Sequence, residues 1–159
     1  PIHTMVNEIT KGKQILEQAF GKRALPVFVP PWNRMTSQLL PHLPEIGLRG
    51  FSGKAPPQQL LAASLPKETH LTVADAHIDI IDWKSNGKFI GEDLALREIA
   101  WHLSARRQEA IPCDTPNCIL THHRQMEDDA FSFLERLLTT TQYFGAMWLS
   151  ASNLFGAAP

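Results

Sequence analysis

Three short runs of residues in this chain join an apolar stretch to side chains that could take part in chemistry. The first, residues 29–34, places two prolines before a Trp, an Asn and an Arg. The second, residues 77–83, contains a His, two Asp and a Trp, and the third, residues 119–123, ends in two His. Such a change from apolar to polar residues is expected where a strand ends at a functional site.

The first run combines a stiff backbone with an aromatic and a cationic side chain. The two prolines restrict the backbone and hold Trp32 at the end of the predicted strand. An indole there could stack on the face of a sugar, and Arg34 could bind a carboxylate. In the alternative interpretation the prolines merely end a strand, Trp32 fills a gap in the core, and Asn33 caps the next helix.

The second run places acidic residues within an apolar strand, where burial is costly unless they are paired or belong to a site. His77 and Asp79 share one face by strand alternation, and Asp82 lies where the strand gives way to its loop. This pattern is equally compatible with a structural role. His77 and Asp79 would then satisfy each other, and Asp82 would cap the turn toward Asn86.

The third run ends in His122 and His123, directly after an apolar strand. A His at such a place can act as a general acid or base near neutral pH. Because neighbouring residues on a strand point to opposite faces, only one of the two is expected to face a site, and for His123 we expect the surface. Another metal-dependent hydrolase is also conceivable, with His122 joined by His77, Asp79 and Asp82 as ligands.

The elements that position these runs alternate between strands and helices. This order is typical of the α/β class with parallel βα units, in which functional groups gather at the carboxyl ends of strands. The length of 159 residues suits a single domain. Periodicity and turn residues predict helices over residues 5–20, 35–43, 91–107, from 127 onward and over 148–155; strands over 25–29, 47–51, 71–81 and 118–121; and loops or turns over 55–67 and 84–88.

Charge and composition exclude some classes of partner. The formal net charge is −1 and the charges are scattered, so we expect no nucleic-acid partner. No apolar run is long enough to span a bilayer. Cys113 and Cys118 lie close together and could form a disulfide or remain two thiols, and metal binding by this pair is the weakest option.

In their order along the chain, the three runs resemble the later signature motifs of the polysaccharide deacetylase family (carbohydrate esterase family 4). The resemblance runs through residues 30–34, a D-x-x-D-W pattern at 79–83 and an L-x-H pattern at 120–122, and it covers about residues 25–138. It implies a distorted (β/α) barrel and a hydrolase that removes acetyl groups from N-acetylated sugars.

The resemblance also implies a divalent metal, most often zinc, held by an Asp and two His from earlier motifs of the family. Nothing before Pro30 contains two adjacent Asp residues, and His3 stands alone there, so neither the paired-Asp motif nor the H-x-x-x-H motif precedes the first run. By this resemblance, we expect the chain to correspond to the C-terminal portion of such a barrel, with the metal ligands outside it. The family commonly has an Arg just before the Pro pair, where this chain has Val29, and the nearby Arg34 follows Asn33 instead.

By the same resemblance, His122 would protonate the departing sugar amine. A neighbouring carboxylate would stabilise the imidazolium, with Asp82 as the first choice and Asp79 as the second. Arg34 would stand in for the missing Arg before the prolines. The chain alone is expected to catalyse little, and the alternative function is a non-catalytic sugar-binding or interaction module derived from this fold. The expected substrate-binding residues are Trp32, Asn33, Pro31, Trp83 and Leu120.

Overall fold

The computed structural model describes residues 1–53 and 71–156. It is a mixed α/β structure that divides into two compact units, Pro1–Asp75 with Leu149–Pro159 (unit 1) and Ala76–Trp148 (unit 2). Each unit is described by itself, and the single domain expected from chain length stays a prediction. The loop expected over 55–67 lies outside the described residues. Within the described part of the chain, no helix has the length and apolar character needed to cross a membrane.

Unit 1 begins with the predicted amphipathic helix, α1 (Ile2–Phe20). It ends at Gly21, whose φ of 55° is accessible to glycine at little cost, and a 3₁₀ turn, η1 (Gly21–Arg23), follows. None of the α1 side chains is fully buried, although Val6 and Ile9 pack against the core of the unit. The helix is therefore held by one partly covered apolar face.

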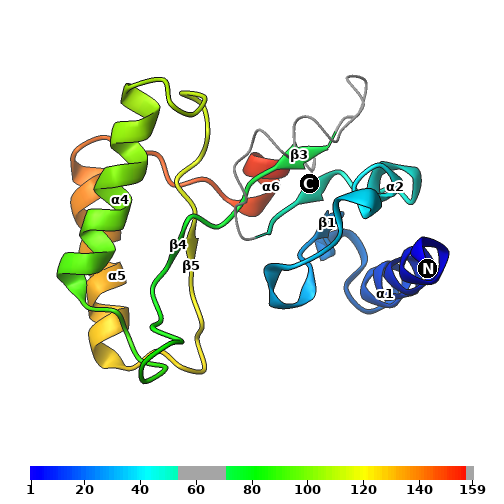
Figure 1. Ribbon diagram of the computed structural model, residues 1–159, viewed down its shortest axis with the longest axis horizontal. Helices are drawn as coiled ribbons and strands as arrows, with labels where there is room; N and C mark the ends of the chain where they lie inside the picture. The colour runs from blue at the N-terminus through cyan, green and yellow to red at the C-terminus, as the bar shows by residue number, and fades with distance from the viewer. Residues whose placement is uncertain (54–70, 157–159) are drawn as a thin grey trace. The chain divides into compact units, whose positions relative to one another are not determined.

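The sheet of unit 1 consists of three short parallel strands in the order β1-β2-β3. They are β1 (Val27–Phe28), β2 (Gly50–Phe51) and β3 (Thr72–Val73), with Phe28 opposite Phe51 and Phe51 opposite Val73. This parallel arrangement confirms the prediction of an α/β structure with parallel strands (Figure 1). The buried core of the unit consists of Leu39, Leu40, Leu43, Leu48, Phe51 and Leu71.

The prediction of a single helix over residues 35–43 is wrong. In its place are two short elements, η3 (Ser37–Leu39) and α2 (His42–Glu45). Pro41 and Pro44 lack the backbone N–H that a continuous helix would use, which explains the interruption.

A short C-terminal helix also belongs to unit 1. This helix, α6 (Ala151–Phe155), covers part of the predicted tail helix and packs beside β3. Ser150 caps its first turn, because its hydroxyl accepts a hydrogen bond from the N–H of Asn153. A Cβ on Gly50 would lie only 2.5 Å from the ring of Phe155, so the close approach of α6 requires glycine there.

The prediction of one continuous strand over residues 71–81 is also wrong. The segment contains two short strands, β3 and β4 (Ile78–Asp79), which belong to different sheets. The interruption falls at Asp75, which is fully buried. Its Oδ1 accepts a hydrogen bond of 2.8 Å from the N–H of Gly53. This contact between residues far apart along the chain ties the segment to unit 1 just before unit 2 begins.

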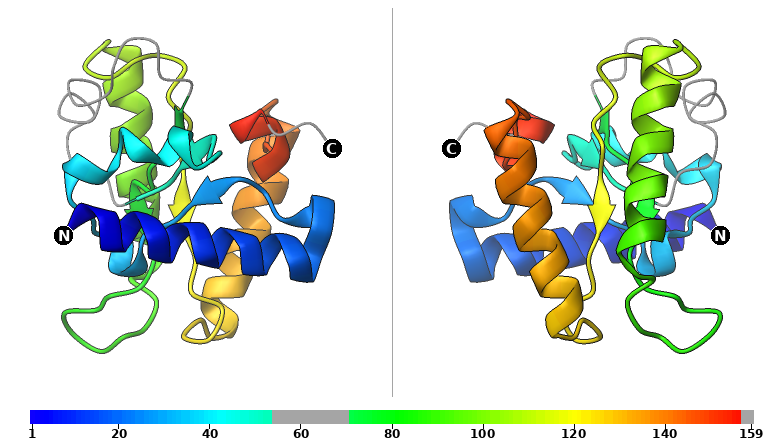
Figure 2. Two further views of the ribbon diagram at one scale, coloured as in Figure 1. Left: turned by 90° about the vertical axis from the view of Figure 1, so that its right-hand side faces the viewer. Right: turned by 90° about the vertical axis from the view of Figure 1, so that its left-hand side faces the viewer.

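Unit 2 contains two parallel strands and two long helices. Strand β4 pairs with β5 (Ile119–Leu120), while α4 (Glu92–Arg107) and α5 (Asp128–Tyr143) cover one face of the pair (Figures 1 and 2). Both helices begin with acidic residues, which suits the positive end of the helix dipole. The core between helices and strands includes Ile78, Ile80, Ile81, Ala95, Met126, Ala130, Phe133 and Leu137.

Candidate functional site

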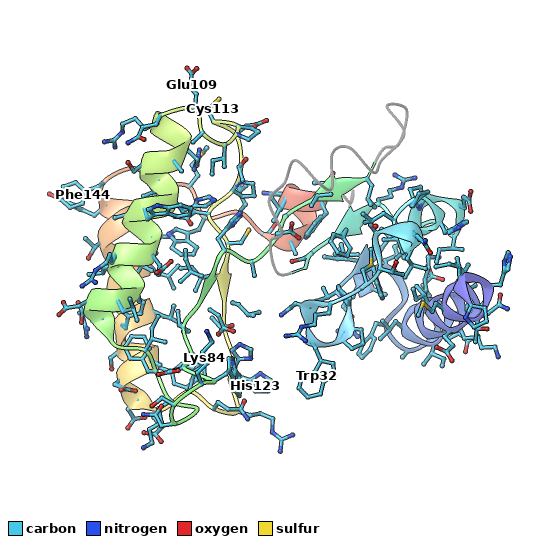
Figure 3. All side chains as sticks on the ribbon, viewed as in Figure 1. Trp32, Lys84, Glu109, Cys113, His123 and Phe144 are labelled. Carbon is cyan, nitrogen blue, oxygen red and sulfur yellow. The ribbon has the colours of Figure 1, made fainter. Side chains whose placement is uncertain are left out.

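The candidate site lies in unit 2, where β4 and β5 end. The register places Asp79 opposite Leu120, so the residues that follow both strands emerge at the same end of the pair. His122 comes two residues after Leu120, and its carbonyl accepts hydrogen bonds from the N–H groups of Gln125 and Met126. This turn fixes the backbone of His122 beside the end of β4. Lys84 and His123, which follow two site residues in sequence, are labelled at this end of the strands in Figure 3.

Three side chains meet there. Nε2 of His122 lies 3.0 Å from Oδ1 of Asp79, and the indole N–H of Trp83 donates to Oδ2 of Asp79 at 3.0 Å. The rings of Trp83 and His122 also contact each other edge to face, with 4.8 Å between centroids. Only 23% of the His122 side chain and 18% of the Asp79 side chain are exposed, so this pair is shielded from most, but not all, solvent.

The chemistry of this group follows from the hydrogen-bonding capacity of its members. An ionised carboxylate can only accept hydrogen bonds, so the proton between the two residues belongs to Nε2 of His122. Nδ1 is then the ring nitrogen left for a substrate. The arrangement can therefore hold a proton and deliver it from Nδ1.

The expectation that Asp82 is the first partner of His122 is wrong. Oδ1 of Asp82 accepts the N–H groups of Lys84 and Ser85, each at 3.1 Å. Its backbone carbonyl accepts the N–H of Gly87, whose φ of 69° closes the turn. The Asp82 carboxylate therefore stabilises the predicted turn over residues 84–88. This is the alternative considered from the sequence, in which Asp82 caps the turn.

His77 is not part of the site, and it does not pair with Asp79 as the structural alternative expected. Its ring packs against that of His102 on α4, with 3.9 Å between centroids. Nδ1 of His77 and both ring nitrogens of His102 are buried and lack a hydrogen-bond partner among the described residues. Burial lowers the pKa of His77. Burial first, and then the charges of His77 and Arg106, lower the pKa of His102 to about 4.

Sequence reasoning missed His102. The signal that could have found it is its spacing on α4, because Ala95, Ile99 and His102 recur at helical intervals on the covered face. The placement of His77 also argues against the four-ligand metal site considered from the sequence. Within the described residues, no group of three or more His, Cys, Asp or Glu side chains could hold a metal ion.

The first run belongs to unit 1. Trp32 and Asn33 both have positive φ, 57° and 53°, which is unusual for residues other than glycine. Trp32 is 90% exposed and projects from the ribbon, so the idea that it fills a core gap is wrong (Figure 3). Asn33 is the last residue of η2 (Pro31–Asn33), and Thr36 is the N-cap of the next helical element, so the idea that Asn33 caps the next helix is also wrong. Arg34 has no ion pair among the described residues. The roles of these residues with the site of unit 2 stay predictions.

Pro31 and Arg34 line a cavity within unit 1. It has a volume of about 890 Å³ and lies between α1 and the segment around β1. Most of its wall is apolar, with Met5, Ile9 and Phe28 among the residues that form it. Two of the residues expected to contact a substrate or tether a catalytic group therefore border an apolar space in this unit.

The cysteines are not joined. Cys113 is exposed, Cys118 is partly buried, and no disulfide links them.

No family model, curated protein or solved structure matches this chain.

Proposed function

We propose that this chain supplies the general-acid side of a metal-dependent deacetylase that acts on N-acetylated sugars, within a distorted (β/α) barrel. One observation carries the proposal: Asp79, Trp83 and His122 form a single hydrogen-bonded group at the end of two parallel strands. These residues come from two separate sequence motifs that resemble those of the polysaccharide deacetylase family. Carboxyl ends of parallel strands are also where α/β hydrolytic sites are commonly assembled.

In the proposed reaction, His122 gives a proton to the sugar amine as the amide bond breaks. Oδ1 of Asp79 holds the ring through Nε2, so the proton leaves from Nδ1. Before the transfer, the imidazolium and the carboxylate of Asp79 form an ion pair; after it, the ring is neutral and keeps its hydrogen bond from Nε2. Removing either side chain should therefore affect bond breaking more than substrate binding.

The proposal also requires an apolar contact for the acetyl methyl. The indole of Trp83 and the side chain of Leu120 lie at the ends of the same two strands, and together they would form the wall for the acetyl methyl. Unit 1 carries exposed Trp32 together with Pro31 and Asn33, and in this proposal these residues contact the sugar, since an indole face packs well on apolar sugar faces. Arg34 would take the place of the family's Arg.

In this proposal a divalent metal, most often zinc in the family, would supply polarisation of the acetyl carbonyl when bound. By the resemblance, its ligands would belong to the earlier motifs of the family, which do not precede the first run in this sequence. The contribution of this chain is then proton transfer and substrate contact.

The test compares His122→Ala with His123→Ala in the complete, zinc-loaded enzyme that contains this chain. Acetate release from an N-acetylglucosamine oligomer should fall by about 10²- to 10⁴-fold in His122→Ala, the range typical of a lost general acid. His123→Ala removes a neighbouring exposed imidazole and should retain activity. Turnover that survives in His122→Ala would remove this residue from the mechanism. Sugar binding without any acetate release from the unmodified enzyme would favour the non-catalytic sugar-binding module instead.

A further inference from the structure

The carboxylate of Asp79 accepts three hydrogen bonds, and they are divided between its two oxygens. Oδ1 accepts from Nε2 of His122 at 3.0 Å and from the backbone N–H of Ile81 at 3.1 Å. Oδ2 accepts from the indole N–H of Trp83 at 3.0 Å. Because all of these donors lie in unit 2, the geometry of the carboxylate is set within this unit.

Trp83 contacts both members of the pair. Its N–H is bonded to Asp79, and its ring meets the ring of His122 at 83°, nearly perpendicular. A side chain that served only as an apolar wall would need the ring and no donor, so Phe would be sufficient. The indole N–H therefore indicates a second role for Trp83.

That role follows from the softness of the carboxylate torsion. The χ2 angle of Asp has a broad distribution, so a single hydrogen bond does not fix the plane of the group. Donors on both oxygens do fix it. With the backbone N–H of Ile81 on Oδ1 and the indole N–H on Oδ2, Oδ1 is held toward Nε2 of His122.

We propose that Trp83 is a positioning residue, whose indole N–H fixes the carboxylate of Asp79 and thereby orients His122 with Nδ1 free. The catalytic consequence rests on the deacetylase proposal above, but the positioning itself is a property of unit 2 and can be measured without activity. The donor, rather than the bulk of the ring, is the part of Trp83 that matters.

The test separates the donor from the ring. In this chain, Trp83 is replaced by β-(3-benzothienyl)alanine, which keeps the size and shape of the indole but has no N–H. Trp101→Phe, at an exposed Trp on α4 of the same unit, is the matched control. Exchange of the His122 Nε2–H with water is measured by NMR on ¹⁵N-histidine-labelled protein, with Asp79→Ala, which removes both carboxylate oxygens, as the reference for complete loss of the pair.

We expect exchange of the His122 ring proton to become about tenfold faster in the benzothienyl variant, the change expected when one hydrogen bond to a charged group is lost. Trp101→Phe should leave the rate unchanged. An unchanged rate in the benzothienyl variant, or an equal increase in Trp101→Phe, would overturn the proposal. If Trp83→Phe accelerates exchange and the benzothienyl variant does not, Trp83 acts through its bulk alone, and the proposal is again overturned.

The activity measurement separates this proposal from the function on which it rests. In the complete zinc-loaded enzyme, the benzothienyl variant should lower kcat about tenfold and leave KM unchanged, because the apolar wall is retained. A fall in kcat accompanied by an equal rise in KM would show a loss of substrate contact and would contradict positioning. If the unmodified enzyme releases no acetate, the deacetylase proposal fails, while the exchange rates still decide the role of Trp83.

Discussion

The buried pair of imidazoles in unit 2 makes acid sensitivity the sharpest quantitative expectation for this protein. His102 is 1% exposed, and its ring nitrogens have no hydrogen-bond partner among the described residues. Its ring contacts that of His77 at 3.9 Å. Burial, followed by the charges of His77 and Arg106, lowers the pKa of His102 to about 4. A proton on this ring would place an unpaired charge in the core.

The direction of the effect follows from linkage. His102 has an ordinary pKa of 6.5 and a folded-state pKa of about 4, so between these values the unfolded chain binds a proton that the folded unit does not. The stability associated with His102 is therefore fully present above pH 6.5 and is lost as the pH falls toward 4. At about 1.4 kcal/mol per pKa unit, the total loss is about 3 kcal/mol.

The measurement is urea unfolding at a series of pH values between 7 and 4. Trp32→Phe is the background, because the remaining tryptophans of the described residues, Trp83, Trp101 and Trp148, all report on unit 2. His102→Leu removes the titrating ring, and His3→Gln removes an exposed imidazole on α1 as the matched control.

We expect the free energy of unfolding to fall with pH by about 3 kcal/mol more in the background protein than in His102→Leu. His3→Gln should follow the background protein. His77 remains in every variant, and burial lowers its pKa, so some acid sensitivity should persist in His102→Leu. Equal acid losses in His102→Leu and in the background protein would refute the assignment of this sensitivity to His102.

Two further expectations concern the acidic residues that sequence reasoning treated as site candidates or left aside. Burial raises the pKa of Asp75, so its contribution to stability is present at low pH and is lost as the pH rises from 3.8 through the folded-state pKa. Asp75→Asn keeps an acceptor for the N–H of Gly53. As the pH rises through that window, the free energy of unfolding of Asp75→Asn should grow relative to that of the original protein by about 1.4 kcal/mol per pH unit. A pH-independent difference in urea unfolding would contradict this account. Asp82→Ala should lower the free energy of unfolding by about 1 kcal/mol, because the N–H groups of Lys84 and Ser85 lose their acceptor. Asp82→Asn keeps an acceptor and should retain most of that stability. Equal thermal stability of the two variants would be evidence against the turn-capping role.

Several elements could be predicted because short-range physics decides them. The apolar spacing and the Gly21 stop locate α1, and the acidic start and basic end locate α4. The turn at Gly87 follows from local turn chemistry. The parallel pairing of strands follows from their alternation with helices, and it already places Asp79 and His122 near one another.

Other features were decided by contacts between residues that are distant in sequence. The pattern over residues 71–81 gives no sign that the strand breaks at Asp75, because its partner, Gly53, lies in a different segment. His77 could pair with its neighbour Asp79 or with a ring on a helix, and only the packing of α4 selected His102.

The partner of His122 shows the same division most clearly. Both Asp79 and Asp82 fit the D-x-x-D-W pattern, and spacing alone cannot choose between two carboxylates three residues apart. The tight turn after β4 decides between them, because the N–H groups of Lys84 and Ser85 in this turn donate to the carboxylate of Asp82. Asp79 is then left to receive a ring from the neighbouring strand. Sequence determines which side chains are available, whereas three-dimensional packing determines which of them satisfy the backbone and which remain for chemistry.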